Sequence, residues 1–150
     1  MTLFYTATAL PQPLTLDFPI FTTLNNNQAG SGLLVRANQY HFTSLYQKGR
    51  FSNIKIDFDV VHKQTSISAY QLTISDLFHQ CDQQDLNAQT YMDQVQVEKG
   101  DQINNLGFPF FDGSDAFNSH RALIEFPIIA TSSTEKSCYG VIAVSIREQI

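Results

Sequence analysis

The sequence contains no tryptophan, and it has little charge, few glycines and prolines, and only two cysteines. Its 7 glycines and 5 prolines are too few for a low-complexity or collagen-like chain. Charged residues make up 15% of the chain and hydrophobic residues 43%, which argues against an intrinsically disordered segment. A chain of 150 residues buries roughly 70% of its unfolded surface. We therefore expect one compact domain over residues 1–150.

Apolar runs are short, and none approaches the roughly 18 residues that a membrane-spanning helix needs. Residues 1–10 carry no Lys or Arg, so we expect no signal peptide. Cys81 and Cys138 are 57 positions apart (138 minus 81), and two cysteines make neither a metal framework nor a dense disulfide scaffold. We predict a free, buried thiol at each position. These features favour a cytoplasmic protein, although a chain packaged in a particle or exported by an unusual route would look the same.

Alternating apolar residues predict several β-strands. The clearest alternation runs from Ile54 to Val60, and a second runs from Leu14 to Ile20. Pro19 has no N–H to donate, so we expect the strand around it to lie at a sheet edge or to be bulged. We predict further strands over residues 33–35, 40–46, 67–72, 123–130 and 139–146, with the last two forming a terminal hairpin.

One segment has helical periodicity. Asp82 is suited to cap a helix, and Asp85 would lie in its first turn, where the helix dipole favours a negative charge. Ala88, Tyr91, Met92 and Val95 then recur at helical spacing. The sequence thus predicts a helix over about residues 82–97. The predicted fold class is α+β, with a mostly antiparallel sheet of about seven strands packed against this one main helix.

The charge is unevenly distributed. The chain carries a net charge of −5 (9 basic minus 14 acidic residues), which argues against a protein that binds nucleic acid by neutralising phosphates. Six acids and one base lie between Asp76 and Asp101. We predict an acidic helix surface that includes Asp82, Asp85 and Asp93 and docks a protein partner, a basic one in particular. The alternative is a solvated helix face without a partner.

Sequence motifs of common enzymes are absent: there is no Walker A loop, G-x-G-x-x-G, G-x-S-x-G or H-E-x-x-H. We therefore expect no catalytic residues and no cofactor. Asp112, Asp115 and His120 are the best candidates for a divalent cation, because carboxylate and imidazole groups are common metal ligands. An ordinary Asp-Gly turn explains Asp112 and Gly113 equally well.

An aromatic segment precedes this turn. Between Gly107 and Gly113 the chain places Phe108, Phe110 and Phe111 around Pro109, a combination that disfavours a long regular element. If these rings cannot all reach the interior, one of them forms an exposed apolar anchor of the kind that marks partner surfaces. The alternative is that the rings fill the core.

The end of the chain resembles a known family. Residues 121–128 form an apolar segment that ends at Pro127, and a second apolar segment begins at Gly140. This pattern is similar to the closing hairpin of GAF-type ligand-sensing domains. The resemblance implies an apolar pocket for a small molecule between sheet and helix. The chain departs from the family because it has no long leading helix and no residues that mark a chromophore or cyclic-nucleotide site.

Three functions follow, in order of preference. The first is a non-enzymatic protein–protein interaction protein: an adaptor, an inhibitor or immunity-type partner, or an assembly subunit that binds copies of itself. The second is a small-molecule binding or sensor domain. The third is an enzyme or metal site around Asp112, Asp115 and His120. We expect binding neither to nucleic acid nor to a membrane.

Overall fold

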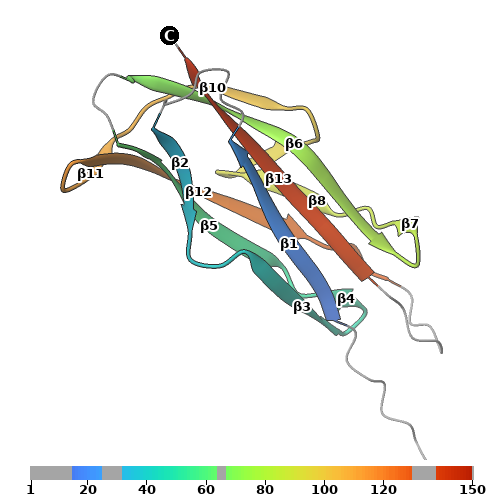
Figure 1. Cartoon of the computed structure of the whole chain (residues 1–150). Coiled ribbons are helices and arrows are strands. Elements are labelled where there is room, and N and C mark those ends of the chain that lie inside the picture. Colours follow the sequence, from blue (N-terminus) through green and yellow to red (C-terminus); the bar gives the residue numbers. More distant parts are fainter. Residues whose placement is uncertain (1–14, 25–31, 64–66, 130–137, 150) are drawn as a thin grey trace, which may run out of the picture.

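The computed structural model describes residues 15–24, 32–63, 67–129 and 138–149, without the side chains of residues 15–24 and Gln47. In these ranges the chain forms 13 strands in two sheets that lie one over the other, and it forms no helix (Figure 1). The predicted α+β class with one main helix is therefore wrong, and the fold is an all-β sandwich. The same ranges contain no helix of the length and apolarity needed to span a membrane.

Sheet 1 is built around its two longest strands. Its order is β10 (Gln102–Leu106), β6 (Ala69–Cys81), β13 (Cys138–Gln149), β1 (Thr15–Leu24), β3 (His41–Gln47) and β4 (Arg50–Phe51), with β7 (Gln84–Asp85) paired to β6. β6 and β13 pair antiparallel from Cys81 opposite Cys138 to Ala69 opposite Gln149, with one register shift between Ala143 and Val144. β1 runs parallel to β13 and antiparallel to β3.

Sheet 2 contains the strand that the sequence predicts most clearly. Its order is β2 (Leu33–Ala37), β5 (Ile54–His62), β12 (Asp115–Glu125), β8 (Gln89–Met92) and β9 (Val95–Val97), with β11 (Phe110–Asp112) paired to β12. Every described pairing in this sheet is antiparallel. The strand predicted from alternation over residues 54–60 is confirmed.

The core fills the space between the two sheets. Inward positions of the four longest described strands with side chains are almost all apolar and buried: Ile54, Ile56, Phe58 and Val60 on β5, Tyr70, Leu72 and Ile74 on β6, Ala122 and Ile124 on β12, and Ile142, Val144 and Ile146 on β13. A fully buried large apolar side chain contributes roughly 1.5–3 kcal/mol. Outward positions of β5 are polar up to Asp59, which fixes the face that this part of the strand presents to solvent.

The segment predicted as a helix forms strand hairpins. Asp82 and Gln83 join β6 to β7, and Asp93 and Gln94 join β8 to β9. All four residues have positive φ, between 50° and 73°, which is typical of the tight two-residue turns of β-hairpins and incompatible with a helix. The helical spacing of the apolar residues is thus overridden by pairing of β8 with β12, a strand more than 20 residues away in sequence.

Two other expectations about strand placement are corrected. The predicted terminal hairpin does not form, because β12 belongs to sheet 2 and β13 to sheet 1. The strand that contains Pro19 lies inside sheet 1, between β13 and β3, and not at an edge. Its pairing with β13 is interrupted, however: Asp17 lies opposite Tyr139 and Ile20 opposite Ile142, and neither Phe18 nor Pro19 is paired with β13.

The prediction of two free thiols is also wrong. Cys81 and Cys138 form a disulfide that joins the first residue of β13 to the last residue of β6. The two cysteines are directly opposite in the ladder, a proximity that their separation of 57 residues in sequence does not reveal. The disulfide therefore holds together the ends of the longest pairing in sheet 1.

We predict that the Cys81→Ala/Cys138→Ala double variant is less stable than the parent by about 2–4 kcal/mol, because a cross-link over this loop length restricts the unfolded chain. Urea denaturation gives both free energies of unfolding. Dithiothreitol should destabilise the parent and leave the double variant unchanged. Equal stability of the two proteins without reductant would contradict the disulfide.

Candidate functional site

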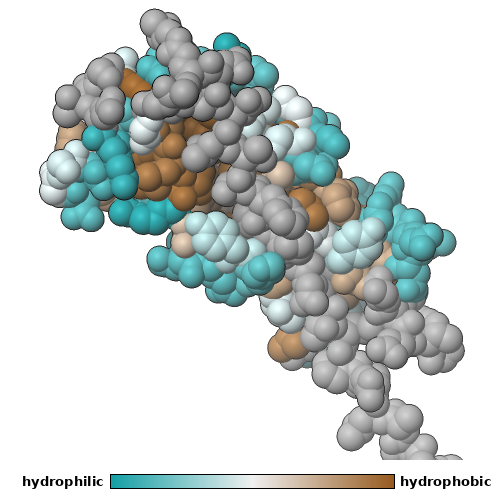
Figure 2. Space-filling model, in the orientation of Figure 1, coloured by the Kyte–Doolittle hydropathy of each residue, from teal (hydrophilic) through white to brown (hydrophobic). Residues whose placement is uncertain are grey.

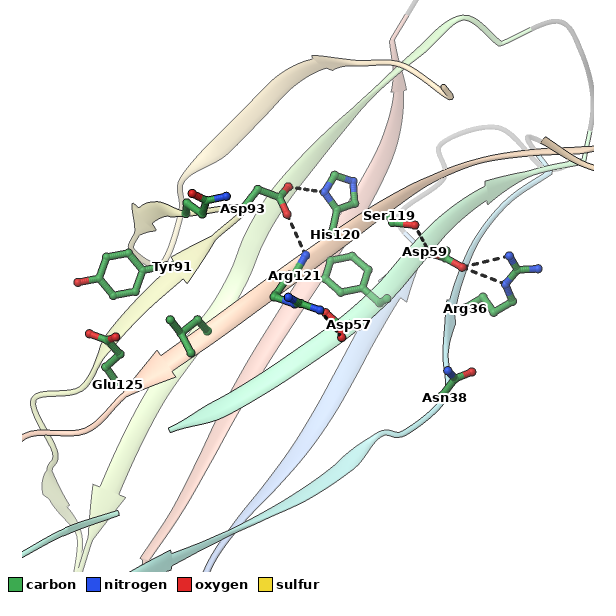
Figure 3. A pocket seen from close by; sticks show the side chains of 13 residues that line it. Arg36, Asn38, Asp57, Asp59, Tyr91, Asp93, Ser119, His120, Arg121 and Glu125 are labelled. Atoms are coloured by element: carbon green, nitrogen blue, oxygen red, sulfur yellow. Dashed lines mark hydrogen bonds and ion pairs between the residues drawn. The ribbon is translucent and has the colours of Figure 1, made fainter. Parts of the chain in front are cut away.

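A groove with a volume of about 720 Å³ lies on the outer face of sheet 2. Its floor is the outward side of β5 and β12, one wall is β2 with the residue that follows it, and the other wall is β8 with its turn (Figure 3). The lining residues are mostly polar or charged: Arg36, Asn38, Asp57, Asp59, Tyr91, Asp93, Gln94, Ser119, Arg121 and Glu125, together with Phe58, His120 and Leu123. We call this feature the sheet 2 groove.

One row of polar contacts crosses the floor between three strands. Arg36 on β2 donates to Asp59 on β5, with Nη2 3.1 Å from Oδ2. The hydroxyl of Ser119 on β12 donates to the other carboxylate oxygen of Asp59 at 2.7 Å. The guanidinium of Arg36 also lies over the ring of Phe117, 5.5 Å from its centroid. These contacts hold the end of the floor nearest β2 in a fixed arrangement.

A second ion pair lies further along the floor. Arg121 donates from Nε and Nη2 to the two carboxylate oxygens of Asp57, at 2.5 and 3.0 Å. This hydrogen bonding lowers the pKa of Asp57 and raises that of Arg121, so both groups stay charged at neutral pH. Both side chains are more than 60% exposed. Since exposed pairs contribute little to stability, this pair mainly presents charge to whatever enters the groove.

Asp93 fastens the β8–β9 turn to the groove. Its backbone N–H donates to the Arg121 carbonyl at 2.9 Å, and its Oδ1 accepts from the Arg121 backbone N–H at 2.8 Å. Its Oδ2 lies 2.6 Å from Nδ1 of His120. The other ring nitrogen of His120 contacts the hydroxyl of Tyr70, so a chain of polar contacts runs from the groove into the core. Three contacts thus hold Asp93 in its positive-φ conformation.

Burial and hydrogen bonding shift the pKa values of Asp93 and Tyr70. Burial alone would raise the pKa of Asp93, but hydrogen bonds from His120 and from the Arg121 backbone leave it below its usual value. Burial raises the pKa of Tyr70, which is fully enclosed, well above its usual value. His120 is only 4% exposed, and its two nitrogens contact Asp93 and Tyr70. The contacts from Asp93 through His120 to Tyr70 therefore hold the β8–β9 turn in place.

The three phenylalanines of the aromatic segment separate. Phe108 is half-buried, with its ring 5.0 Å from that of Tyr70 and 5.6 Å from that of His62. Phe110 is 50% exposed and Phe111 is 74% exposed at the β11–β12 hairpin. The structure therefore places one ring against the core and two at the surface, where a role in partner binding stays a prediction.

The predicted acidic surface is divided between the two sheets. Asp82 and Asp85 lie at the β6–β7 hairpin of sheet 1, whereas Asp93 lies in the sheet 2 groove. Without a helix in the described ranges, the proposed acidic helix face does not exist, and neither does the expected pocket between sheet and helix.

The candidate metal ligands are also divided. Asp112 and Asp115 are partners across the β11–β12 hairpin, whereas His120 faces inward toward Asp93 and Tyr70. In the part of the chain that the structure describes, no group of three or more His, Cys, Asp or Glu residues is arranged to hold a metal ion.

The sequence does not predict that most of the groove residues lie together. The alternation of Asp57 and Asp59 with apolar residues does indicate that both face outward from one strand. Their partners Arg36 and Arg121 lie 23 and 64 residues away from them, and only the order of the strands brings them together. The groove has four acids (Asp57, Asp59, Asp93, Glu125) and two arginines, which sum to a net charge of −2 for these six residues. The arrangement is therefore a charged groove with a net negative lining.

The comparisons with known proteins find little. No protein-family model matches the chain, and no curated protein sequence matches it. Among solved structures, the chain is similar to the CooA pilin subunit from enterotoxigenic Escherichia coli, with a TM-score of 0.44 and 9% sequence identity. That match covers 92% of this chain and 99% of the other. A similarity of this size assigns no function.

We predict that Asp93→Asn destabilises the protein by about 1–2 kcal/mol at pH 7. The asparagine amide has only one oxygen, so its NH₂ group would face either the Arg121 backbone N–H or Nδ1 of His120 in place of a carboxylate oxygen. Folding lowers the pKa of Asp93 below 3.8, so its carboxylate adds stability above that pH and the effect fades as pH falls through the folded-state pKa. Urea denaturation at pH 7 and pH 3 should show a difference between parent and variant that shrinks in acid.

The matched control is Asp112→Asn, an exposed acid at the β11–β12 hairpin that makes no ion pair within the described ranges. It should change stability by no more than about 0.5 kcal/mol. An equal effect of the two substitutions, or a difference for Asp93→Asn that does not depend on pH, would contradict the assigned role of Asp93.

Proposed function

We propose that this protein is a non-enzymatic assembly subunit that binds further copies of itself through strand β1. The observation that carries the proposal is the position of β1 in sheet 1. β1 is the first described strand in sequence, yet it lies inside the sheet and is paired on one side with β13 and on the other with β3. A strand from a second copy can occupy the same place.

The gap that β1 fills has to be occupied. Without β1, both β13 and β3 would present a row of unpaired backbone N–H and C=O groups. Such edges pair readily with another extended chain. If β1 of one copy fills the gap in another, every pairing of the sheet is kept, so the exchange costs little apart from the entropy of association.

The pairing of β1 is also weaker than that of its neighbours. Its contact with β13 is the one parallel pairing among the described strands, and parallel pairs are slightly less stable per residue. Pro19 has no N–H to donate and, with Phe18, is not paired with β13. A strand with these features can leave its place at lower cost than β6, which pairs with β13 on the opposite side.

The disulfide adds a condition to the proposal. Disulfides persist in oxidising compartments and are rare in the reducing cytosol. The expectation of a cytoplasmic protein was based on the lack of an expected signal peptide and on two free thiols. The disulfide removes the second of these reasons, and cytoplasmic localisation stays a prediction. We add that assembly takes place under oxidising conditions.

We predict that two copies, each carrying one introduced cysteine, cross-link between chains. Thr23 on β1 lies opposite Ser145 on β13, so a Thr23→Cys chain mixed with a Ser145→Cys chain should form a mixed disulfide when β1 exchanges. Both native cysteines are already paired, and the introduced thiol is therefore the one free thiol in each chain. Copies carrying tags of different size, unfolded and refolded together, show the product on a non-reducing gel.

Thr73→Cys provides the control. Thr73 is the partner of Ser145 on β6, one strand further from Thr23. Two strand spacings amount to roughly 9–10 Å, beyond the reach of a disulfide. The Thr23→Cys and Thr73→Cys mixture should therefore give only background cross-linking. If the Thr23→Cys and Ser145→Cys mixture gives no more product than this control, β1 does not exchange.

A further inference from the structure

We infer that the sheet 2 groove binds a second copy of this chain through the turn between β3 and β4. That turn carries Lys48, Gly49 and Arg50, with Lys48 and Arg50 both exposed. Together with Ile128, which lies beside Gly49, these residues form a surface that we call the basic tip. The inference rests on the proposed function in that it takes the occupant to be a copy of the chain, but it uses a contact separate from β1.

The basic tip is a rigid projection. Lys48 and Gly49 both have positive φ, at 51° and 85°, which is the geometry of a tight two-residue hairpin. The N–H of Ile129 donates to the Gly49 carbonyl at 2.6 Å, and the hydroxyl of Tyr46 donates to the Ile129 carbonyl at 2.8 Å. These bonds fasten the segment after β12 to the turn. The tip therefore loses little conformational freedom when it binds.

An exposed apolar side chain lies at the centre of the tip. Ile128 is 81% exposed, the highest value among the large apolar residues of the described ranges. Its Cγ2 atom is 3.6 Å from the position that a Cβ at Gly49 would take. Lys48 and Arg50 make no ion pair with another described residue. The tip thus combines one apolar anchor with two cations that have no ion-pair partner in the described ranges.

The groove offers the complementary features. It carries a net charge of −2 (four acids, two arginines), against +2 for the two cations of the tip. Tyr91 and Leu123 provide half-buried apolar surface in the groove, next to Glu125, which makes no ion pair among the described residues. Ile128 of one copy would contact Tyr91 and Leu123 of the other, while Lys48 and Arg50 approach the acids. A volume of about 720 Å³ is sufficient for these side chains.

The tip and the groove adjoin one another on each chain. Ile128 follows Glu125 by three positions, so the tip lies next to the end of the groove that Glu125 forms. A surface that carries both complementary halves side by side can pair with its own copy about a two-fold axis. Each copy then places its tip in the groove of the other. On the face that Figure 2 shows, which is the side of sheet 1, a hydrophobic patch (brown) lies among hydrophilic residues (teal) of the described chain.

The experiment uses chains in which β1 cannot exchange. A Thr23→Cys/Ser145→Cys chain that is oxidised within itself keeps β1 in its own sheet. In this background the locked parent should associate, as measured by sedimentation equilibrium, and its association should weaken by tenfold or more between 50 and 500 mM salt. Failure of strand exchange and failure of the groove contact are thereby separated, because the locked chain does not depend on the first.

Charge reversal then identifies the surfaces. Lys48→Glu/Arg50→Glu reverses the tip, and Gln94→Lys/Glu125→Lys changes the groove from −2 to +1 (adding one and two charges). Each variant alone should lose at least tenfold in association constant, and a mixture of the two should recover it. Lys63→Glu/Arg147→Glu is the matched control for the tip variant, because it makes the same change in net charge at exposed sites outside the tip and groove. It should associate as the locked parent does.

The inference is overturned if the locked parent stays monomeric at millimolar concentration. It is equally overturned if the mixture of tip and groove variants fails to associate, or if the control loses as much association as the tip variant. Near-ultraviolet circular dichroism of each variant verifies the native fold, and since all the residues changed in the charge variants are exposed or half-buried, we expect each to fold.

Discussion

The antiparallel ladder between β6 and β13 is the contact on which the rest of this structure depends. It runs the full length of both strands and is closed at one end by the Cys81–Cys138 disulfide. β10 and β7 pair with β6, and β1 pairs with β13, so every other strand of sheet 1 is positioned directly or indirectly by this pair. The two strands supply 8 of the 20 buried residues of the described core cluster, and sheet 2 packs against them.

Because β6 and β13 pair with one another without β1, we propose that sheet 1 has a permanent part, formed by β6 and β13, and an exchangeable part, β1. β13 is held by β6 on one side, and its other edge needs a partner that β1 supplies through an interrupted parallel pairing. The same division accounts for the groove. Sheet 2 rests on the permanent part, so β5 and β12 present a fixed floor on which Arg36, Asp59, Asp57 and Arg121 are already oriented by one another before anything binds. Pre-oriented groups lose little freedom on binding.

The sequence predicts local features of this fold and misses those that depend on distant partners. The alternation over residues 54–60 predicts β5, because each inward side chain is apolar and each outward one polar until Val61. The helix over residues 82–97 fails because Thr90 and Met92 pair with Ile124 and Ala122, and this contact outweighs a weak local preference. The disulfide and the groove are not predicted for a related reason. Cys81 and Cys138, like Asp57 and Arg121, are far apart in sequence, and only the order of the strands shows that they are neighbours.

Hydrogen–deuterium exchange tests most directly whether β1 is the exchangeable part of a permanent sheet. In the monomeric protein, peptides that cover residues 15–24 should exchange at least tenfold faster than peptides that cover residues 69–81, although both strands pair with β13. A tenfold difference corresponds to an opening free energy that is lower for β1 by about 1.4 kcal/mol. Equal protection of the two strands would mean that β1 opens only with the whole sheet, and it would contradict assembly by strand exchange.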